Sequence, residues 1–356
     1  MSGRVQVAAR AIPVSLPHED LVSSLLAWVI VTALYFDGRA HVLGLPDSFF
    51  TPWHAFLYGG LLLLVGWLAV LSRMTARRQG AGRFAVVPTG YGPAVAGAVI
   101  FGVGGVADMV WHEVFGIESG LDALLSPTHL VLFAGGSLLF SGPVRAVRGR
   151  AGSPGPLAAV ASALSVTAIA GIVAFALSYI SGFLADQPAY PLSNAAEGSA
   201  EHIASDAMAS AGLASYVVTS LVIVVPLTFM LRLGIVPPGA VFFLVTSLAV
   251  LGEVLYDFTN PWVMGAGAVA GAVAELVLAG LRRRGARLRL QELILAALLP
   301  LLLWPGQLLA IEVLWHVQWS PELINGVVIV SSVLSFMTVL VLGVPARQDR
   351  GTSLHR

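Results

Sequence analysis

Long apolar segments alternate with short polar connections along nearly the whole chain of 356 residues. Each segment approaches the roughly 20 residues that an α-helix needs to cross a bilayer. They cover residues 21–36, 54–72, 93–114, 127–142, 157–184, 207–231, 239–257, 262–281, 291–316 and 322–344. The pattern predicts an all-α, polytopic integral membrane protein with about ten transmembrane helices arranged as five hairpins.

The connections divide the chain into five parts. Residues 1–20 form a polar arm without the charged, apolar and cleavage-site order of a signal peptide, so we expect the first helix to remain as an anchor. Two hairpins follow over residues 21–144, then a linker over 145–156, three further hairpins over 157–344 and a tail over 345–356. Ten helices leave no room for a soluble domain of useful size.

Composition supports this class of protein and narrows its chemistry. Hydrophobic residues make up 57% of the chain, charged residues 11%, and the mean hydropathy is +0.86, which excludes an ordinary soluble domain. The lipid bilayer is therefore a predicted partner. Cysteine is absent, which excludes disulfides, thiolate ligands and cysteine nucleophiles. The net charge of zero predicts no nucleic-acid partner.

The distribution of arginine predicts an orientation. All 19 basic residues are arginine, and 18 of them lie in the N-terminal arm, the even-numbered connections and the tail, whereas only Arg39 lies in an odd-numbered connection. By the positive-inside rule, the arm, the linker and the tail should be cytoplasmic, in a multi-pass protein of the cell inner membrane. Fourteen of the 19 acidic residues and six of the eight histidines fall on the opposite, outer side, so we expect the chemistry there.

One motif on that side occurs twice. A carboxylate and a histidine stand four residues apart at the end of an apolar segment, and a second histidine follows a Thr-Pro or Ser-Pro pair at the start of the next segment. Residues four apart share one helix face, so three metal-capable side chains should converge at each corner. The two triads are Asp37, His41 and His54, and Asp108, His112 and His129.

The motif allows a metal site and a simpler alternative. A Thr or Ser caps the free amides of a helix start, and Pro fits the first helical position. The later histidine then lies near the positive end of the helix dipole, which favours the neutral imidazole that binds metals. Histidine with carboxylate and no sulfur suits Cu(II), Zn, Fe(II) or Mn rather than Cu(I). The alternative is a hydrogen-bonded pair with a histidine that contacts lipid headgroups.

The fourth and fifth outer corners carry weaker versions of the motif. They read Glu253-x-x-x-Asp257 followed by Asn260-Pro261, and Glu312-x-x-x-His316 followed by Ser320-Pro321. We interpret them as structural hydrogen bonding, with an additional polar site as the alternative. The residues of that site would be Glu253, Asp257, Glu312, His316 and Glu322.

Two charged residues next to the triads are candidates for supporting roles. Arg39 lies between Asp37 and His41, and we expect it to pair with Asp37 or Asp47. Glu113 follows His112 directly and points about 100° away from it on a helix, so it is a candidate to support a ligand or to act as a general base.

The first triad resembles the metal triad in the C subunit of the particulate methane and ammonia monooxygenases. In that family a carboxylate and a histidine on one transmembrane helix join a histidine that heads the next helix after Thr-Pro. The resemblance implies copper at Asp37, His41 and His54, with zinc as the alternative. The second triad resembles that family's second site, with Asp in place of Asn and three more residues before the last histidine. The resemblance covers about 120 residues.

The sequence therefore predicts a membrane metalloprotein with one or two outward-facing His/carboxylate sites, resembling a copper monooxygenase subunit. Copper is the predicted cofactor, with zinc or iron as alternatives, and a homo- or hetero-oligomer is compatible with the resemblance. Whether the protein is an enzyme stays open. A cation or metal transporter and a non-catalytic assembly factor are the alternative functions. Polar residues at mid-membrane depth are sparse, with Gln307 the main one, which favours a surface site over a conduit.

Overall fold

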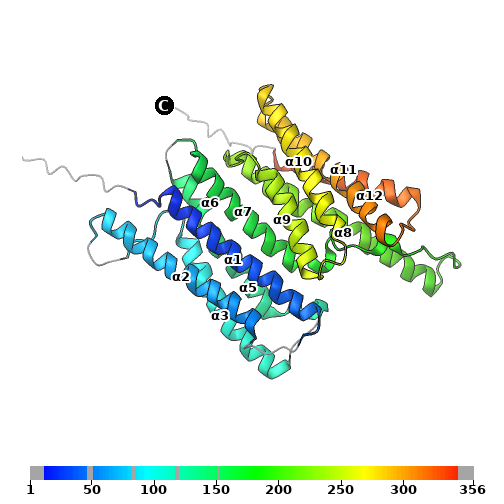
Figure 1. Ribbon diagram of the computed structural model, residues 1–356, viewed down its shortest axis with the longest axis horizontal. Coiled ribbons are helices and arrows are strands. Elements are labelled where there is room, and N and C mark those ends of the chain that lie inside the picture. Colours follow the sequence, from blue (N-terminus) through cyan, green and yellow to red (C-terminus); the bar gives the residue numbers. More distant parts are fainter. Residues whose placement is uncertain (1–11, 46–50, 82–84, 117–119, 151, 344–356) are drawn as a thin grey trace, which may run out of the picture.

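The structure is a computed structural model, which describes residues 12–45, 51–81, 85–116, 120–150 and 152–343 (Figure 1). These residues form α-helices and short 3-10 turns, and the all-α prediction is confirmed. The first half contains α1 (Pro17–Val42), α2 (Pro52–Arg78), α3 (Gly92–Phe115), α4 (Gly120–Leu125), α5 (Pro127–Phe140), α6 (Gly142–Ala146) and α7 (Pro156–Ala176). The second half contains α8 (Ala200–Leu233), α9 (Ala240–Leu255), α10 (Trp262–Arg283), α11 (Leu288–Leu314) and α12 (Pro321–Leu342).

Each of the ten predicted segments falls on a helix, but the number of helices that could span a membrane is smaller. Within the described ranges, eight helices are long and apolar enough, and a ninth span results if α5 and the short helices after it, which are bent by 43°, count as one. The remaining segment, α9, has only 16 residues, equivalent to about 24 Å of helix. By length and composition the structure therefore supports eight or nine spans among the described residues, and a tenth stays a prediction.

Two predicted boundaries differ from the structure. The segment predicted over 157–184 leaves the α-helix at Ala176 and continues as a 3-10 turn at Ser178–Ile180. The next segment was expected from 207, but α8 begins at Ala200, where Ser199 caps the helix by accepting a hydrogen bond from the His202 amide. Hydropathy alone misses both boundaries because it registers burial in lipid rather than the local hydrogen bonds that start or end a helix.

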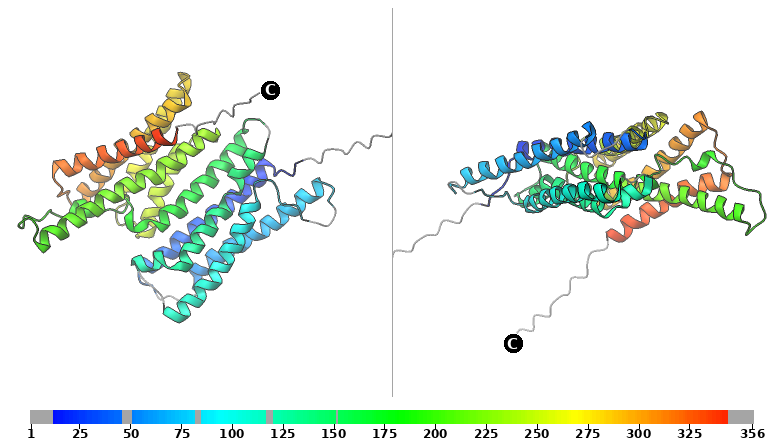
Figure 2. Two further views of the ribbon diagram at one scale, coloured as in Figure 1. Left: turned by 180° about the vertical axis from the view of Figure 1, so that it is seen from behind. Right: turned by 90° about the horizontal axis from the view of Figure 1, so that it is seen from below.

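The helices pack around two cores. The first is built from α1, α2, α3, α5 and α7 with the end of α9, and the second from α7 to α12. The first two hairpins lie in two layers, with α1 and α2 on one side and α3 and α5 on the other (Figure 2). Within this half, α1 packs on α2 and α7, and α3 packs on α5. This arrangement brings the C-terminal ends of α1 and α3 near the N-terminal ends of α2 and α5.

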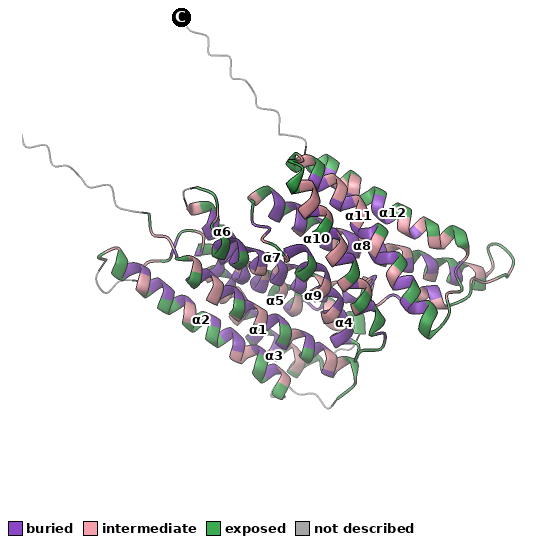
Figure 3. Cartoon of the chain, turned by 45° about the horizontal axis from the view of Figure 1, so that its top comes forward, coloured by how far each residue is buried: buried purple, intermediate pink, exposed green. Residues whose placement is uncertain are grey.

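Exposed residues run along the helices (Figure 3), and many of them are large and apolar. The clearest row is on α3, where five valines are between 53% and 66% exposed. These are Val99, Val103, Val106, Val110 and Val114. A continuous apolar row of this kind is unfavourable in water and favourable in a bilayer, so it supports contact with lipid.

The end of the bundle away from the triads holds buried carboxylates paired with arginines. Glu19 at the start of α1 lies 2.6 Å from Arg78, and the neighbouring Asp20 pairs with Arg150. On α11, Glu292 accepts hydrogen bonds from Arg232 and from Arg289 on its own helix. Asp20 precedes Asp37 by 17 residues on one helix, about 25 Å. The arginine-rich end and the triads are thus at opposite ends of α1, as the charge distribution predicted, while the side of the membrane that each faces stays a prediction.

Candidate metal centres

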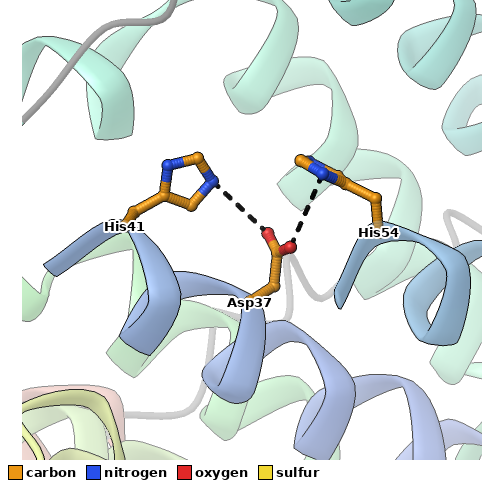
Figure 4. A group of neighbouring side chains, drawn as sticks. All are labelled: Asp37, His41 and His54. Atoms are coloured by element: carbon orange, nitrogen blue, oxygen red, sulfur yellow. Dashed lines mark ion pairs between the residues drawn. The ribbon is translucent and has the colours of Figure 1, made fainter. Parts of the chain in front are cut away.

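The first triad forms where α1 ends and α2 begins (Figure 4). Asp37 is 7% exposed, with one carboxylate oxygen 3.8 Å from Nε2 of His41 and the other 3.7 Å from Nδ1 of His54. His54 is buried and His41 is half-buried. The two imidazoles therefore lie on either side of one carboxylate, as the spacing of the motif predicted.

The second triad repeats this arrangement where α3 ends and α5 begins. Asp108 is 1% exposed, with one carboxylate oxygen 3.4 Å from Nε2 of His112 and the other 3.6 Å from Nε2 of His129. Both imidazoles are half-buried. The repetition in sequence is thus a repetition in space, with one helix end and one helix start contributing to each triad.

The distances within the triads are compatible with a shared metal ion. In each triad the ligand atoms all lie within 4.8 Å of one another. Ligands held tetrahedrally at about 2.0 to 2.2 Å from zinc would be about 3.4 Å apart. Hydrogen bonds between nitrogen and oxygen are shorter, at about 2.7 to 3.2 Å. The four carboxylate–imidazole separations, from 3.4 to 3.8 Å, lie nearer to the metal value.

Backbone carbonyls orient both imidazoles of the second triad. Nδ1 of His112 lies 3.3 Å from the Gly116 carbonyl oxygen, and Nδ1 of His129 lies 2.5 Å from that of Ala123. A carbonyl can only accept, so Nδ1 carries the proton and donates it in each case. If each ring is neutral, its lone pair is then on Nε2, the nitrogen that faces Asp108. This is the arrangement in which histidine binds a metal.

Hydroxyl groups of Thr and Ser residues contact Asp108 and the later histidine of each triad. Thr128 donates a hydrogen bond of 2.7 Å to Asp108, and so fixes that carboxylate from the side of α5. Ser126 caps α5 through the His129 amide, as predicted. Thr51 does not cap α2 with its side chain, although its hydroxyl, like that of Ser126, lies near Nδ1 of the histidine three residues on, at 3.0 Å from His54. The predicted cap at Thr51 was therefore wrong, and the hydroxyl contacts the imidazole.

Both triads line one cavity of about 590 Å³. Its walls between the triads are mainly aliphatic and aromatic side chains. They include Ile30, Leu57, Phe101, Leu132, Phe133 and Phe175. The sequence predicted the two triads separately but gave no indication that they share a cavity, because this depends on how the α1–α2 layer packs against α3 and α5.

Tyr58 links the two halves of this cavity. Its ring stacks on His54, with centroids 6.4 Å apart and planes at 16°. Phe133 stacks on His129 in the same way, at 6.2 Å and 19°. Each aromatic residue follows its histidine by four positions, so the internal repeat extends beyond the ligands. Tyr58 also packs against Gly105 of α3, one turn before Asp108. Sequence analysis did not identify Tyr58, although its spacing from His54 was a signal that could have found it.

Arg39 and Glu113, the two residues predicted to support the triads, do not contact them as expected. Arg39 pairs with Asp257, at 2.5 Å, rather than with Asp37, because α1 packs beside the turn after α9. Asp47, the other predicted partner, lies outside the described residues. Glu113 is exposed and does not line the cavity.

The fourth and fifth corners do not join the triads. Glu253 is buried and accepts a hydrogen bond from the Asn260 amide, whereas Glu312, His316 and Glu322 are exposed. Glu312 accepts from the Val317 amide at 2.7 Å, the structural role expected for this corner. The side chain of Asn260 does not cap α10. Among the described residues, only the two triads form groups that could hold a metal.

No protein-family model, curated protein or solved structure matches the chain. The class that the fold and the site define is a helical protein with several apolar helices that could span a membrane and two His/Asp groups that could hold metal ions. The resemblance to a monooxygenase subunit therefore continues to depend on the triad motifs alone.

Proposed function

We propose that this protein is a membrane metalloprotein in which each triad holds one transition metal ion and both ions face a single apolar cavity. The observation that carries the proposal is the cavity of about 590 Å³ lined by two His/His/Asp groups. A structural role for one triad would be unremarkable, but two triads turned toward the same space indicate a shared function. Copper is the metal that the resemblance implies, and the same donors accept zinc or iron.

The donor set leaves room for a reactant. Two imidazoles and one carboxylate provide three protein ligands, which leaves coordination positions open for a small molecule. The same set of two histidines and one carboxylate is used by oxygenases with non-haem iron. A redox-active ion bound there would supply activation of dioxygen. We therefore place the protein with metal-dependent enzymes that act on small apolar molecules, in line with the resemblance to a monooxygenase subunit.

The chain's own groups suit such a reaction. Ile30, Leu57, Phe101 and Leu132 offer an apolar surface that excludes water and favours an apolar substrate. Backbone carbonyls orient the imidazoles of the second triad so that Nε2 of each ring faces Asp108. Preorganised ligands lower the cost of assembling the site.

A transport function is less well supported. A conduit needs polar groups at mid-membrane depth. Between Asp20 and Asp37, α1 carries no charged residue. Beneath the first triad, α2 contributes Leu61, Leu64, Leu68 and Leu71 to a closed apolar core. The arrangement favours a reaction at one end of the bundle over passage through it.

Single-site variants test the proposal. Detergent-purified wild type, His41→Ala and His112→Ala would each be supplied with Cu(II), Zn(II), Fe(II) and Mn(II), and the bound metal counted by mass spectrometry. Each variant should lose about one ion per chain because two protein ligands hold a metal poorly. His202→Ala is the matched control, since His202 pairs with Asp206 at the same spacing, 3.3 Å apart, but belongs to neither triad. Equal metal content in all four proteins would contradict the proposal.

A further inference from the structure

A second cavity, of about 570 Å³, adjoins the triad cavity. We call it the Glu253 cavity. It is formed by the connection between α7 and α8, the turn between α9 and α10, and the end of α11. Ser178, Tyr179 and Tyr256 line both cavities, so the two are neighbours at the same end of the bundle. No residue of either triad lines the Glu253 cavity.

The deepest charged group of this cavity is Glu253, which is 1% exposed. Its Oε2 accepts a hydrogen bond of 2.9 Å from the Asn260 amide, and Oε1 has no hydrogen-bond partner among the described residues. The turn that positions Asn260 is strained, since Asp257 and Phe258 have φ values of 57° and 58°. Strain of this kind persists where the surrounding structure enforces it, often at a functional site.

Several other groups of the lining are acidic or offer hydrogen-bond acceptors to the cavity. Asp186 provides a second carboxylate, and the amide oxygens of Asn260 and Gln187 are buried without a hydrogen-bond partner within the described ranges. No arginine or histidine is among the lining residues. The nearby Arg39 is engaged by Asp257, which does not line the cavity. A buried carboxylate without a basic partner is costly unless a proton or a bound cation neutralises it.

The volume of the Glu253 cavity and its aromatic lining favour an organic cation over a metal ion. Five aromatic side chains line the cavity, namely Tyr179, Phe183, Tyr190, Tyr256 and Trp315. Aromatic faces attract organic ammonium groups, and small-molecule sites have volumes of about 300 to 1,000 Å³. A transition metal ion would need several histidine or carboxylate ligand atoms within a few ångströms, but Glu253 belongs to no such group in the described chain.

We propose that the Glu253 cavity binds a small organic ammonium cation, with the charge against the Glu253 carboxylate and the alkyl groups against the aromatic side chains. Asp186 lies nearer to solvent and contributes to the attraction of the cation. The site is separate from the metal chemistry of the triads, although the shared wall places its ligand next to the triad cavity.

Binding of choline to the detergent-purified full-length protein tests this proposal. Its neutral isostere, 3,3-dimethyl-1-butanol, has the same shape without the charge. Choline should bind, as measured by calorimetry and by a rise in melting temperature, and the isostere should bind at least about tenfold more weakly, because removal of one close charge pair costs at least about one decade. Equal effects of the two compounds on wild type would overturn the proposal whether or not any variant folds.

Variants locate the site. Glu253→Gln keeps an acceptor for the Asn260 amide but removes the charge, and should weaken choline binding at least about tenfold. Glu197→Gln, an exposed carboxylate in the α7–α8 connection that does not line the cavity, should leave it unchanged. His112→Ala should also bind choline normally, so a failure of the metal proposal would not affect this result. Unchanged binding in Glu253→Gln, or displacement of choline by calcium at equal ionic strength, would contradict an organic-cation site.

Discussion

At the scale of single residues, the two triads differ in what holds their carboxylates. Thr128 donates a hydrogen bond to Asp108, but the equivalent position of the first motif is Trp53, which has no hydroxyl. Groups that orient metal ligands typically change metal affinity by about 10- to 100-fold. Thr128 therefore makes the second triad the better place to test such support.

Thr128→Val should lower the metal affinity of the second triad by about 10- to 100-fold, because Asp108 loses its fixed orientation. The measurement is competition with a chelator in a His41→Ala background, where only the second triad is complete. Thr167→Val is the control, since Thr167 is buried and bonds the Ala163 carbonyl of its own helix. Equal affinities in the two variants would show that Thr128 has no part in metal binding.

At the scale of elements, Tyr58 makes the contact through which α2 meets α3 between the triads. A Cβ on Gly105 would lie 2.7 Å from the Tyr58 ring, whereas nothing lies within 4 Å of one on Gly102 of the same helix. Gly105→Ala should therefore lower the free energy of unfolding by about 1 to 3 kcal/mol, in the range of overpacked cores.

Gly102→Ala should be neutral or slightly stabilising, because alanine is the better helix former. Melting temperatures of the two variants in the same detergent give the comparison. A Gly105→Ala protein as stable as wild type would mean that Tyr58 is free to move away from α3, and that the packing between the two triads is looser than described.

The elements also show how far the sequence alone could lead. The length of the apolar segments was enough to locate the helices. The four-residue spacing of Asp37 and His41 was enough to predict that both side chains share a helix face, since both features are local. Arg39 was assigned the wrong partner because Asp257 is 218 positions away and only the packing of α1 near α9 brings the two together. The Glu19–Arg78 pair was missed for the same reason.

The shared cavity is likewise a property of packing. Each triad is specified by one helix end and the next helix start, and so can be read from contiguous sequence. Two other features depend on side chains from segments that are far apart in the chain. One is the contact of Tyr58 with α3, and the other is the position of Glu253 in a separate cavity. No local pattern encodes such contacts.

At the scale of the whole molecule, the distribution of arginine predicts the orientation. Reporter fusions in the connections near residues 45, 120, 195, 259 and 319 should report the outer side, and fusions at both termini the cytoplasm, because arginine-rich segments are retained there. Fusions near residues 80 and 285 provide the matched cytoplasmic comparison. A terminus on the outer side would overturn the orientation and place the triads toward the cytoplasm.

The central claim is that two metal ions face one cavity. Metal analysis of the detergent-purified wild-type protein, combined with X-ray absorption at the edge of the bound metal, tests it most directly. The account predicts about two ions per chain, each with nitrogen and oxygen ligands at about 2.0 to 2.2 Å that include two imidazoles. Less than about a tenth of an equivalent of any transition metal, after copper, zinc, iron and manganese have each been supplied, would contradict it, since ligands so arranged should retain an ion.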